Sequence, residues 1–277
     1  MAESASITGK NEFVISCEWY DGMQEHVVVP EGVNKIGARA FANNRYVREV
    51  VLPEGIVVIG EEAFASCVNL VSVNIPSTVR IIETGAFKGC WRIEEMSVPE
   101  GVVEIPERTF ARCRCLKRVE LPNSLVAIGD FAFQHCAQLE DFSLPANLER
   151  IGESVFYNCQ KISFEAFPAQ LETIENEAFR MCTALENVDI PDSVGWLGQR
   201  CFKDCTHLQT VALPEGVEFI EEGMFEGCES LDVVVIPQSI THVESRAFAG
   251  TGLTVDDLAL PAECTIAPDA FDSASSS

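Results

Sequence analysis

Eight cysteines recur at an interval of 23 residues, which makes them the first candidates for chemistry. They are Cys67, Cys90, Cys113, Cys136, Cys159, Cys182, Cys205 and Cys228. If the units that carry them stack, the thiols form a straight row about 5 Å apart. Such a row offers zinc two or three ligands at poor angles rather than a tetrahedral set. Its Cβ atoms also lie beyond the roughly 3.5–4.5 Å that a disulfide needs. We therefore interpret this cysteine ladder as a row of small buried thiols.

The remaining nucleophiles and ligands do not form a recognisable site. Cys113 with Cys115, and Cys201 with Cys205, lack the second pair or the helix start that would make a metal or redox site specific. We expect Cys201 in the core, and Cys115 and Cys17 to be exposed. The histidines occupy four different slots of the repeat, so they cannot converge: His26, His135, His207 and His242. No HExxH, Gly-x-Ser-x-Gly, phosphate-loop or EF-hand motif occurs. The sequence therefore predicts no enzyme, no metal site and no cofactor.

The elements that position the cysteines belong to a repeat. Prolines recur every 23 residues from Pro30 to Pro237, with Pro261 one residue late. Phenylalanines recur at the same interval from Phe41 to Phe271 without a slip, so that eleven units are counted twice. Most of the 13 prolines and 17 phenylalanines of the chain are thus committed to one slot per unit.

Each unit predicts two short strands and a tight turn. In residues 70–76, Val73 and Ile75 alternate with polar neighbours as in a half-buried strand, and Pro76 ends that strand. The apolar pair Val79 and Ile82 predicts the second strand. The following glycine and acidic residues, before the next Phe, are typical of one helical turn. One unit is too small for a core of its own, so the units must stack.

This organisation divides the chain into three parts. Residues 27–271 form a solenoid of about eleven units without internal domain boundaries. Residues 1–26 are predicted to cap it with a hairpin, in which residues 13–19 and 25–29 pair around Asp21-Gly22. The Ser-rich tail, residues 272–277, is predicted to be disordered.

The motif Leu-x-x-apolar-x-apolar-Pro followed by Ile-Gly-x-x-Ala-Phe-x-x-Cys resembles the BspA-like leucine-rich repeats. Residues 116–136 and 208–228 carry it most fully. The resemblance implies a mainly β repeat solenoid, a right-handed coil with short parallel strands on a concave face and turns or short helical turns on a convex face. It also implies binding functions, as in surface adhesins, with no catalytic residue. The cysteine ladder then fills the slot that other leucine-rich repeats give to Asn.

Charge and composition restrict the partner. The 277 residues contain 19 Lys and Arg against 43 Asp and Glu, a formal charge of −24. This charge disfavours nucleic-acid phosphates and anionic lipid headgroups, and it favours a basic protein partner. The chain opens without a basic start and an apolar segment, and it has no apolar run long enough for a membrane span. We therefore expect a cytoplasmic, monomeric protein with reduced thiols and no membrane insertion.

An acidic strip is expected on the concave face, at the slots two, four and five residues before each proline. Its members are Glu94, Glu95, Glu140, Asp141, Glu186, Asp189, Asp232, Asp256 and Asp257, interrupted by Lys117, Arg118 and Glu120. Such a strip suits a basic peptide or a Lys/Arg-rich surface. The alternative is solvated charge that keeps sheet edges from aggregating.

An aromatic patch is expected in the C-terminal half, five residues after successive prolines. Trp196, Phe219 and His242 occupy this slot, where earlier units have Lys35, Glu104 and Arg150. Contiguous exposed rings mark an interface, although local bending can tuck them inward.

Three further apolar residues, Phe164, Val233 and Val235, are expected at outward slots of the first strand. The seventh unit also places Glu165 at an inward slot, which indicates a register shift or a buried charge with a partner.

The function that the sequence favours is a non-enzymatic protein-interaction scaffold, which binds through the acidic strip, the aromatic patch or both. Two alternatives stay open: a permanent structural subunit of a larger assembly, and a surface or adhesin-type binding protein. A metal- or redox-responsive role for the cysteines is a weaker third.

Overall fold

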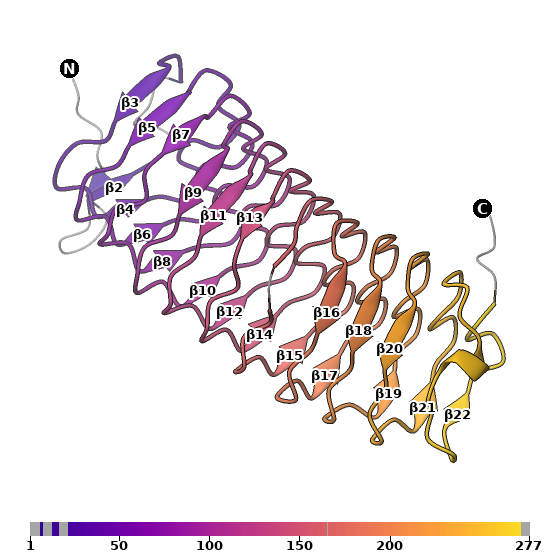
Figure 1. The fold of residues 1–277 in the computed structure, drawn as a ribbon. Helices are drawn as coiled ribbons and strands as arrows, with labels where there is room; N and C mark the ends of the chain where they lie inside the picture. Colours follow the sequence, from indigo (N-terminus) through magenta and orange to yellow (C-terminus); the bar gives the residue numbers. More distant parts are fainter. Residues whose placement is uncertain (1–5, 8–12, 17–21, 165, 273–277) are drawn as a thin grey trace.

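The computed structural model describes residues 6–7, 13–16, 22–164 and 166–272. In it the chain winds into an elongated solenoid of about eleven coils, with the first and the last coil at opposite ends of the molecule (Figure 1). The coils are built from short strands and tight turns with almost no helix. No described helix is both long and apolar enough to cross a membrane.

Two rows of strands run along the solenoid (Figure 1). The first row lies just before the prolines and comprises β3 (His26–Val28), β5 (Glu49–Val51), β7 (Ser72–Val73), β9 (Glu95–Ser97), β11 (Arg118–Glu120), β13 (Asp141–Phe142), β16 (Asn187–Asp189), β18 (Thr210–Ala212) and β20 (Val233–Val235). The second row follows the prolines and comprises β2 (Phe13–Ile15), β4 (Lys35–Ile36), β6 (Val58–Ile59), β8 (Ile81–Ile82), β10 (Glu104–Ile105), β12 (Ala127–Ile128), β14 (Arg150–Ile151), β15 (Thr173–Ile174), β17 (Trp196–Leu197), β19 (Phe219–Ile220), β21 (His242–Val243) and β22 (Thr265–Ile266).

Neighbouring coils pair in parallel with the register of the repeat, as Val50 with Val73 and Ile128 with Ile151 show. Each row is interrupted. The first row forms three three-stranded sheets, and the second row forms sheets of four, five and three strands, the first of which gains the antiparallel strand β1 (Ser6–Ile7) as a fifth. Breaks fall between β7 and β9, between β13 and β16, between β8 and β10, and between β17 and β19.

A stack of phenylalanine rings fills the centre of the solenoid. The rings from Phe41 to Phe271 stack nearly parallel, with centroids 4.9 Å apart for Phe41 and Phe64 and 5.9 Å apart for Phe202 and Phe225. Each ring from Phe41 to Phe248 is buried. Buried aliphatic residues of both strand rows surround this stack, so one continuous core runs through the described coils.

In the turn that carries each Phe, successive backbone N–H groups donate hydrogen bonds alternately to carbonyls of the same coil and of the next coil. Phe64 N–H donates to the Ala86 carbonyl of the next coil at 2.8 Å, and Cys67 N–H donates to Phe64 of its own coil at 3.1 Å. This alternation requires positive φ two residues before and after the Phe, as at Glu62 (50°) and Ser66 (59°). Glycine holds these slots in some coils, but most are held by residues with side chains.

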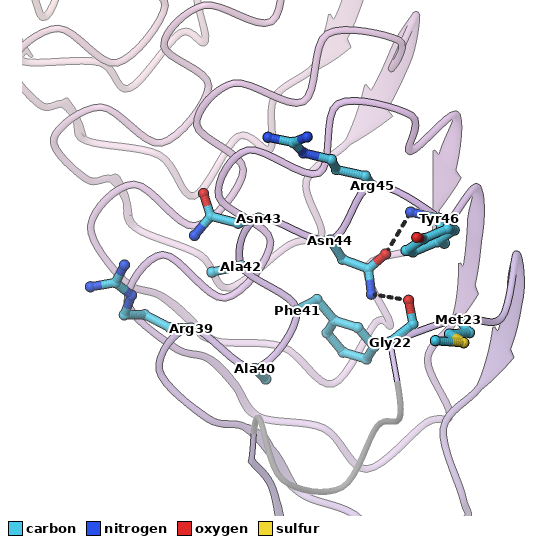
Figure 2. Close-up of a pocket in the computed structure, with 10 residues that line it drawn as sticks. All are labelled: Gly22, Met23, Arg39, Ala40, Phe41, Ala42, Asn43, Asn44, Arg45 and Tyr46. Carbon is cyan, nitrogen blue, oxygen red and sulfur yellow. Dashed lines mark hydrogen bonds between the residues drawn. The ribbon is translucent and has the colours of Figure 1, made fainter.

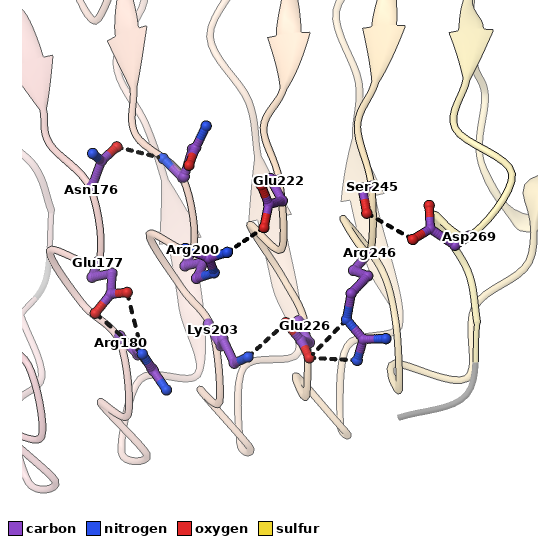
Figure 3. A network of polar contacts seen from close by, with 11 residues as sticks. Asn176, Glu177, Arg180, Arg200, Lys203, Glu222, Glu226, Ser245, Arg246 and Asp269 are labelled. Carbon is purple, nitrogen blue, oxygen red and sulfur yellow. Dashed lines mark hydrogen bonds and ion pairs between the residues drawn. The ribbon is translucent and has the colours of Figure 1, made fainter. Parts of the chain in front are cut away.

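Ion pairs connect adjacent coils on the turn side (Figure 3). Glu226 accepts from Lys203 of the preceding coil at 2.7 Å and from Arg246 of the following coil at 2.6 Å. Burial pushes the pKa of Glu226 upward, but these two cations outweigh it and the net pKa is lowered. Arg200 pairs with Glu222 in the same way.

The N-terminal hairpin that the sequence predicts is wrong. β2 pairs with β1 (Ser6–Ile7) and with β4, whereas β3 pairs with β5 in the other row. The reason is that Ile15 continues the second-row column above Ile36, while Val27 continues the first-row column above Val50, so the two segments lie on different sides of the first coil. Asp21 of the expected turn lies outside the described residues.

At this end Asn44 takes the cysteine slot (Figure 2). Its Nδ2 donates to the Gly22 carbonyl at 3.3 Å, and its Oδ1 accepts from the backbone N–H groups of Tyr46 and Val47. A hollow of about 380 Å³ lies beside it.

The last coil is less well packed. The 3₁₀ helix η1 (Val255–Asp257) replaces a first-row strand, and Ile266 and Phe271 are only partly buried because no described coil covers them. The tail beyond residue 272 lies outside the described residues.

Candidate functional site

The cysteine ladder is buried, as predicted, and its thiols act as hydrogen-bond donors. All eight side chains are fully buried. Cys90 Sγ donates to the Phe64 carbonyl of the preceding coil at 3.1 Å, and the same bond repeats in every coil from Cys67 to Cys228. Burial raises the pKa of Cys67, Cys113, Cys159 and Cys205 to about 12. A protonated buried thiol is a poor nucleophile and metal ligand, so this row is structural.

The cysteines outside the ladder fall as expected where the structure describes them. Cys201 is buried and Cys115 is exposed. Cys264 is partly exposed, which the sequence did not single out. Cys17 lies outside the described residues. Within the described part of the chain, no three His, Cys, Asp or Glu side chains are placed to hold a metal ion.

The aromatic patch, Trp196, Phe219 and His242, lies on the second strand row and faces solvent. Trp196 is 46% exposed and Phe219 is 38% exposed, and both begin their strands, β17 and β19. The Phe219 ring stacks on the His242 ring with centroids 4.9 Å apart and an interplanar angle of 13°. The inward-tucked alternative is therefore excluded for Trp196 and Phe219.

Carboxylates flank the patch in two columns of the repeat. Glu172 and Glu218 lie four residues after their prolines and are exposed. Glu221 and Glu244 lie seven residues after their prolines, beside the patch on the turn side. Burial, and then repulsion by Glu244, raises the pKa of Glu221. The rings are thus bordered by negative charge on both sides.

The sequence matches a known family over nearly all of its described length. The family is described as BspA type Leucine rich repeat region (6 copies), and the match covers residues 34–163 and 161–276. The chain belongs to the BspA-type leucine-rich repeat family. Proteins of this solenoid family are typically non-enzymatic, and the fold serves as a repeat scaffold for protein interaction.

Solved leucine-rich repeat structures are similar to this chain. A leucine-rich cell surface protein from Faecalibacterium prausnitzii is 28% identical, over 84% of this chain and 80% of that one, with a TM-score of 0.52. A leucine-rich repeat protein from Bacteroides ovatus is 24% identical, over 90% and 76%, with a TM-score of 0.64. One from Eubacterium ventriosum is 18% identical, over 91% and 84%, with a TM-score of 0.55. The last two show the fold alone. No curated protein sequence matches the chain.

The acidic strip of this BspA-type solenoid divides into two parts. In its N-terminal part the acids are exposed but paired with interleaved cations: Glu94 with Lys117 at 2.7 Å, Glu140 with Lys161 at 3.3 Å, and Asp141 with Arg118 at 3.4 Å. The bond to Glu94 raises the pKa of Lys117, with a smaller contribution from Glu140. Glu95 is exposed in the same region. These pairs favour the solvated-charge interpretation here.

In its C-terminal part the strip has no such cations. Glu186, Asp189 and Asp232 are exposed, and within the described part of the chain none of them forms a salt bridge. Val233 and Val235 are exposed beside Asp232 on β20, as expected. They belong to the first row, so the structure does not bring them together with the aromatic patch.

Phe164 does not face outward as the sequence predicts. It packs partly against the core, edge-on to Phe167 with centroids 4.9 Å apart. The reason is that the seventh coil forms no first-row strand among its described residues, so the alternation that would point Phe164 outward is lost. A hollow of about 580 Å³ opens there beside Glu140 and Ala166. Glu165, the inward acid of that unit, lies outside the described residues.

Sequence reasoning missed the carboxylate columns around the patch. Glu218 and Glu221 lie after the proline beside Phe219, whereas the charged slots expected to form a strip lie before the proline. The signal was present in the column alignment. A second set of exposed apolar side chains, Val57, Ile81 and Val103, was also missed on the second row of the N-terminal half.

Proposed function

We propose that this chain is a binding scaffold that holds a basic protein partner against the aromatic patch. The observation that carries the proposal is the solvent exposure of Trp196 and Phe219, with Phe219 stacked on His242, on adjacent coils of a rigid solenoid. Exposed contiguous rings are the side chains that most often anchor protein interfaces.

The charge distribution supports a basic partner at this end. Residues 204–277 contain fourteen Asp or Glu side chains and a single Lys or Arg, which is Arg246. The excess of negative charge therefore concentrates around and beyond the patch. Such a field attracts a Lys/Arg-rich surface and speeds its encounter.

The patch is a better candidate than the N-terminal part of the acidic strip. There, Lys117, Arg118 and Lys161 already pair with acids of the strip. A partner would have to displace these exposed pairs for little net gain. Glu186, Asp189 and Asp232 are open to a partner large enough to reach both strand rows.

A capture experiment tests the proposal. The tagged chain, the double variant Trp196→Ala/Phe219→Ala and the control Trp91→Ala are used to capture partners from the native cell. Trp91 is a matched control because it is also exposed, at 42%, but lies outside the patch. We expect the double variant alone to lose a partner that the wild type and the control retain, with melting temperatures unchanged. Equal capture by all three proteins contradicts the proposal, and a large loss of stability means that the rings are core.

A surface-binding role is a second candidate, since the similar Faecalibacterium prausnitzii protein is described as a cell surface protein. Fractionation of the native cell separates this role from the cytoplasmic location, which stays a prediction. A permanent structural subunit would differ from a free scaffold in purification: the scaffold is expected as a stable monomer, and the subunit aggregates unless its partners are present.

A further inference from the structure

Three outward-facing aromatic rings of this solenoid each carry an arginine of the same chain. The guanidinium carbon of Arg114 lies 4.8 Å from the Trp91 ring centroid, that of Arg108 lies 4.7 Å from Phe131, and that of Arg180 lies 5.4 Å from Tyr157. In all three the arginine is supplied from a neighbouring coil. The fold thus covers one exposed ring, Trp91, and two half-buried rings, Phe131 and Tyr157, with a guanidinium. A guanidinium binds a ring face better than an ammonium does.

Trp196 and Phe219 have no such arginine within the described part of the chain. The C-terminal part of the sequence also has no other arginine that is available to cover these rings. After Lys203 the only Lys or Arg is Arg246, and its guanidinium is bound to Glu226 on the turn side at 2.6 Å. A guanidinium or ammonium over the Trp196 ring must therefore come from another molecule.

Carboxylates lie close enough to the Trp196 ring to pair with a cation bound over it. Arg150 occupies the same slot as Trp196 two coils earlier, and its guanidinium reaches Glu175, seven residues after its proline, at 3.5 Å. Glu221 holds the slot of Glu175 in the coil after Trp196. A guanidinium that lies over the Trp196 ring is thus within reach of the Glu221 carboxylate, while Glu218 borders the ring from the other side.

Space for the incoming group is present beside Trp196. A Cβ built on Gly195 would meet no atom within 4 Å, so the flank of the ring is open. The strand row is also interrupted there. Among the described residues no hydrogen bond joins β17 to β19, although Gly195 N–H and Thr241 N–H make the expected bonds to the coils before each of them. An incoming side chain therefore meets an open flank beside the Trp196 ring.

We infer that the patch is an arginine-recognition site: an arginine of the partner stacks on Trp196 and bonds the carboxylates of Glu218 and Glu221. This inference rests on the proposed function, because it names the chemistry by which the same patch selects its partner. It differs from general attraction of positive charge, because stacking requires the planar guanidinium and pairing requires its charge.

Three peptides of alternating glycine and a test residue separate these contributions. The test residue is arginine, lysine or citrulline, which keeps the planar shape of arginine without its charge. Binding to the full chain is measured by fluorescence anisotropy of a label on the peptide. We expect the arginine peptide to bind about fivefold or more tightly than either of the others, because only it combines stacking with an ion pair.

Variants of the chain assign this preference to the patch. We expect Trp196→Ala to abolish the preference for arginine over lysine, Glu218→Gln/Glu221→Gln to abolish the preference for arginine over citrulline, and Trp91→Ala to leave both unchanged. Thermal melting of each variant shows whether it is folded. Equal binding of the arginine and lysine peptides, or an arginine preference that survives Trp196→Ala in a folded protein, overturns the inference.

The two proposals fail separately. If Trp196→Ala/Phe219→Ala loses partner capture but the arginine peptide shows no preference, the docking function stands and arginine recognition is wrong. If the peptide preference depends on Trp196 but capture from the cell does not, the patch recognises arginine and the proposed scaffold function is wrong.

Discussion

Cys136 donates its thiol proton to the carbonyl of Phe110 in the preceding coil, with Sγ and O separated by 3.1 Å. The same carbonyl accepts the N–H of Cys113 in its own coil at 3.1 Å. One acceptor thus joins two coils, and the pattern repeats along the cysteine ladder. The thiols replace the amides that other leucine-rich repeats use at this slot, and they remain protonated because they are buried.

Stability should fall steeply at alkaline pH. Burial raises the pKa of Cys113 from 9.0 to about 12 in the folded state, so the unfolded chain releases this proton first as pH rises. The stabilising contribution is fully present below pH 9.0 and is lost as pH rises toward about 12. Within that pH window, each such thiol lowers the free energy of unfolding by about 1.4 kcal/mol per pH unit. Urea unfolding at increasing pH measures the slope.

The variant Cys113→Ala isolates one thiol. It should be less stable than the wild type at neutral pH, yet its stability should decline less steeply above pH 9.0, whereas Cys115→Ala should change neither property because Cys115 is exposed. Identical slopes for the wild type and Cys113→Ala would contradict the buried, protonated state.

Thiol accessibility gives an independent prediction. In the native protein without reductant, a thiol reagent should label Cys115 rapidly and Cys264 more slowly, since these are the described cysteines that are not buried. The buried thiols should react only on unfolding, because reaction requires both access and the thiolate. Mass spectrometry of labelled peptides under native and denaturing conditions reads this out. Rapid native labelling of eight or more cysteines would falsify the buried ladder.

The coil architecture followed from the sequence because it depends on strict spacing. The Phe and Cys columns each place one side chain per coil, and a stacked solenoid is the arrangement that buries them together. The structure of the N-terminal end and of the seventh coil could not be predicted from the sequence. At both places the spacing alone leaves the pairing partner open, and Ile15 and Phe164 are positioned by packing on the adjacent coil.

The aromatic patch could be located from the sequence, but its surroundings could not be fully recognised. Trp196 and Phe219 stand out because no earlier unit has an aromatic side chain at their slot. That they lack an arginine, unlike Trp91, is visible only when Arg114 of the next coil is seen over the Trp91 ring. Such a contact depends on side-chain reach between coils, which repeat spacing does not specify.

Because the turns hold residues at positive φ, removing a glycine and introducing one at the same slot should have opposite effects on stability. Gly89 has φ 72°, and a Cβ there would lie no closer than 3.5 Å to its neighbours, so Gly89→Ala should cost only the conformational penalty, about 1 kcal/mol. Ser66 has φ 59° at the same slot one coil earlier, so Ser66→Gly should be neutral or stabilise by about 0.5 kcal/mol. Chemical denaturation measures both.

Gly195→Ala serves as the control, since Gly195 has no positive φ and open space around its Cβ position. We expect this substitution to be neutral or slightly stabilising. If Gly89→Ala were as well tolerated as Gly195→Ala, the left-handed turn geometry would be wrong.

Removing a ring from the phenylalanine stack should cost less at the C-terminal end than in the middle. Phe156 stacks on Phe133 and Phe179 at 5.7 and 5.3 Å and is fully buried, so Phe156→Ala should destabilise the solenoid by about 3–5 kcal/mol. Phe271 is partly exposed and stacks on Phe248 alone at 5.3 Å, so Phe271→Ala should cost less than half as much. Because each coil is stabilised by its neighbours, the second variant should loosen the last coils only.

Hydrogen exchange followed by mass spectrometry distinguishes the two effects. For Phe271→Ala we expect faster exchange confined to residues beyond about 240. For Phe156→Ala we expect faster exchange throughout the solenoid. Equal and global effects of both substitutions would show that the coils unfold as one unit, contrary to this prediction.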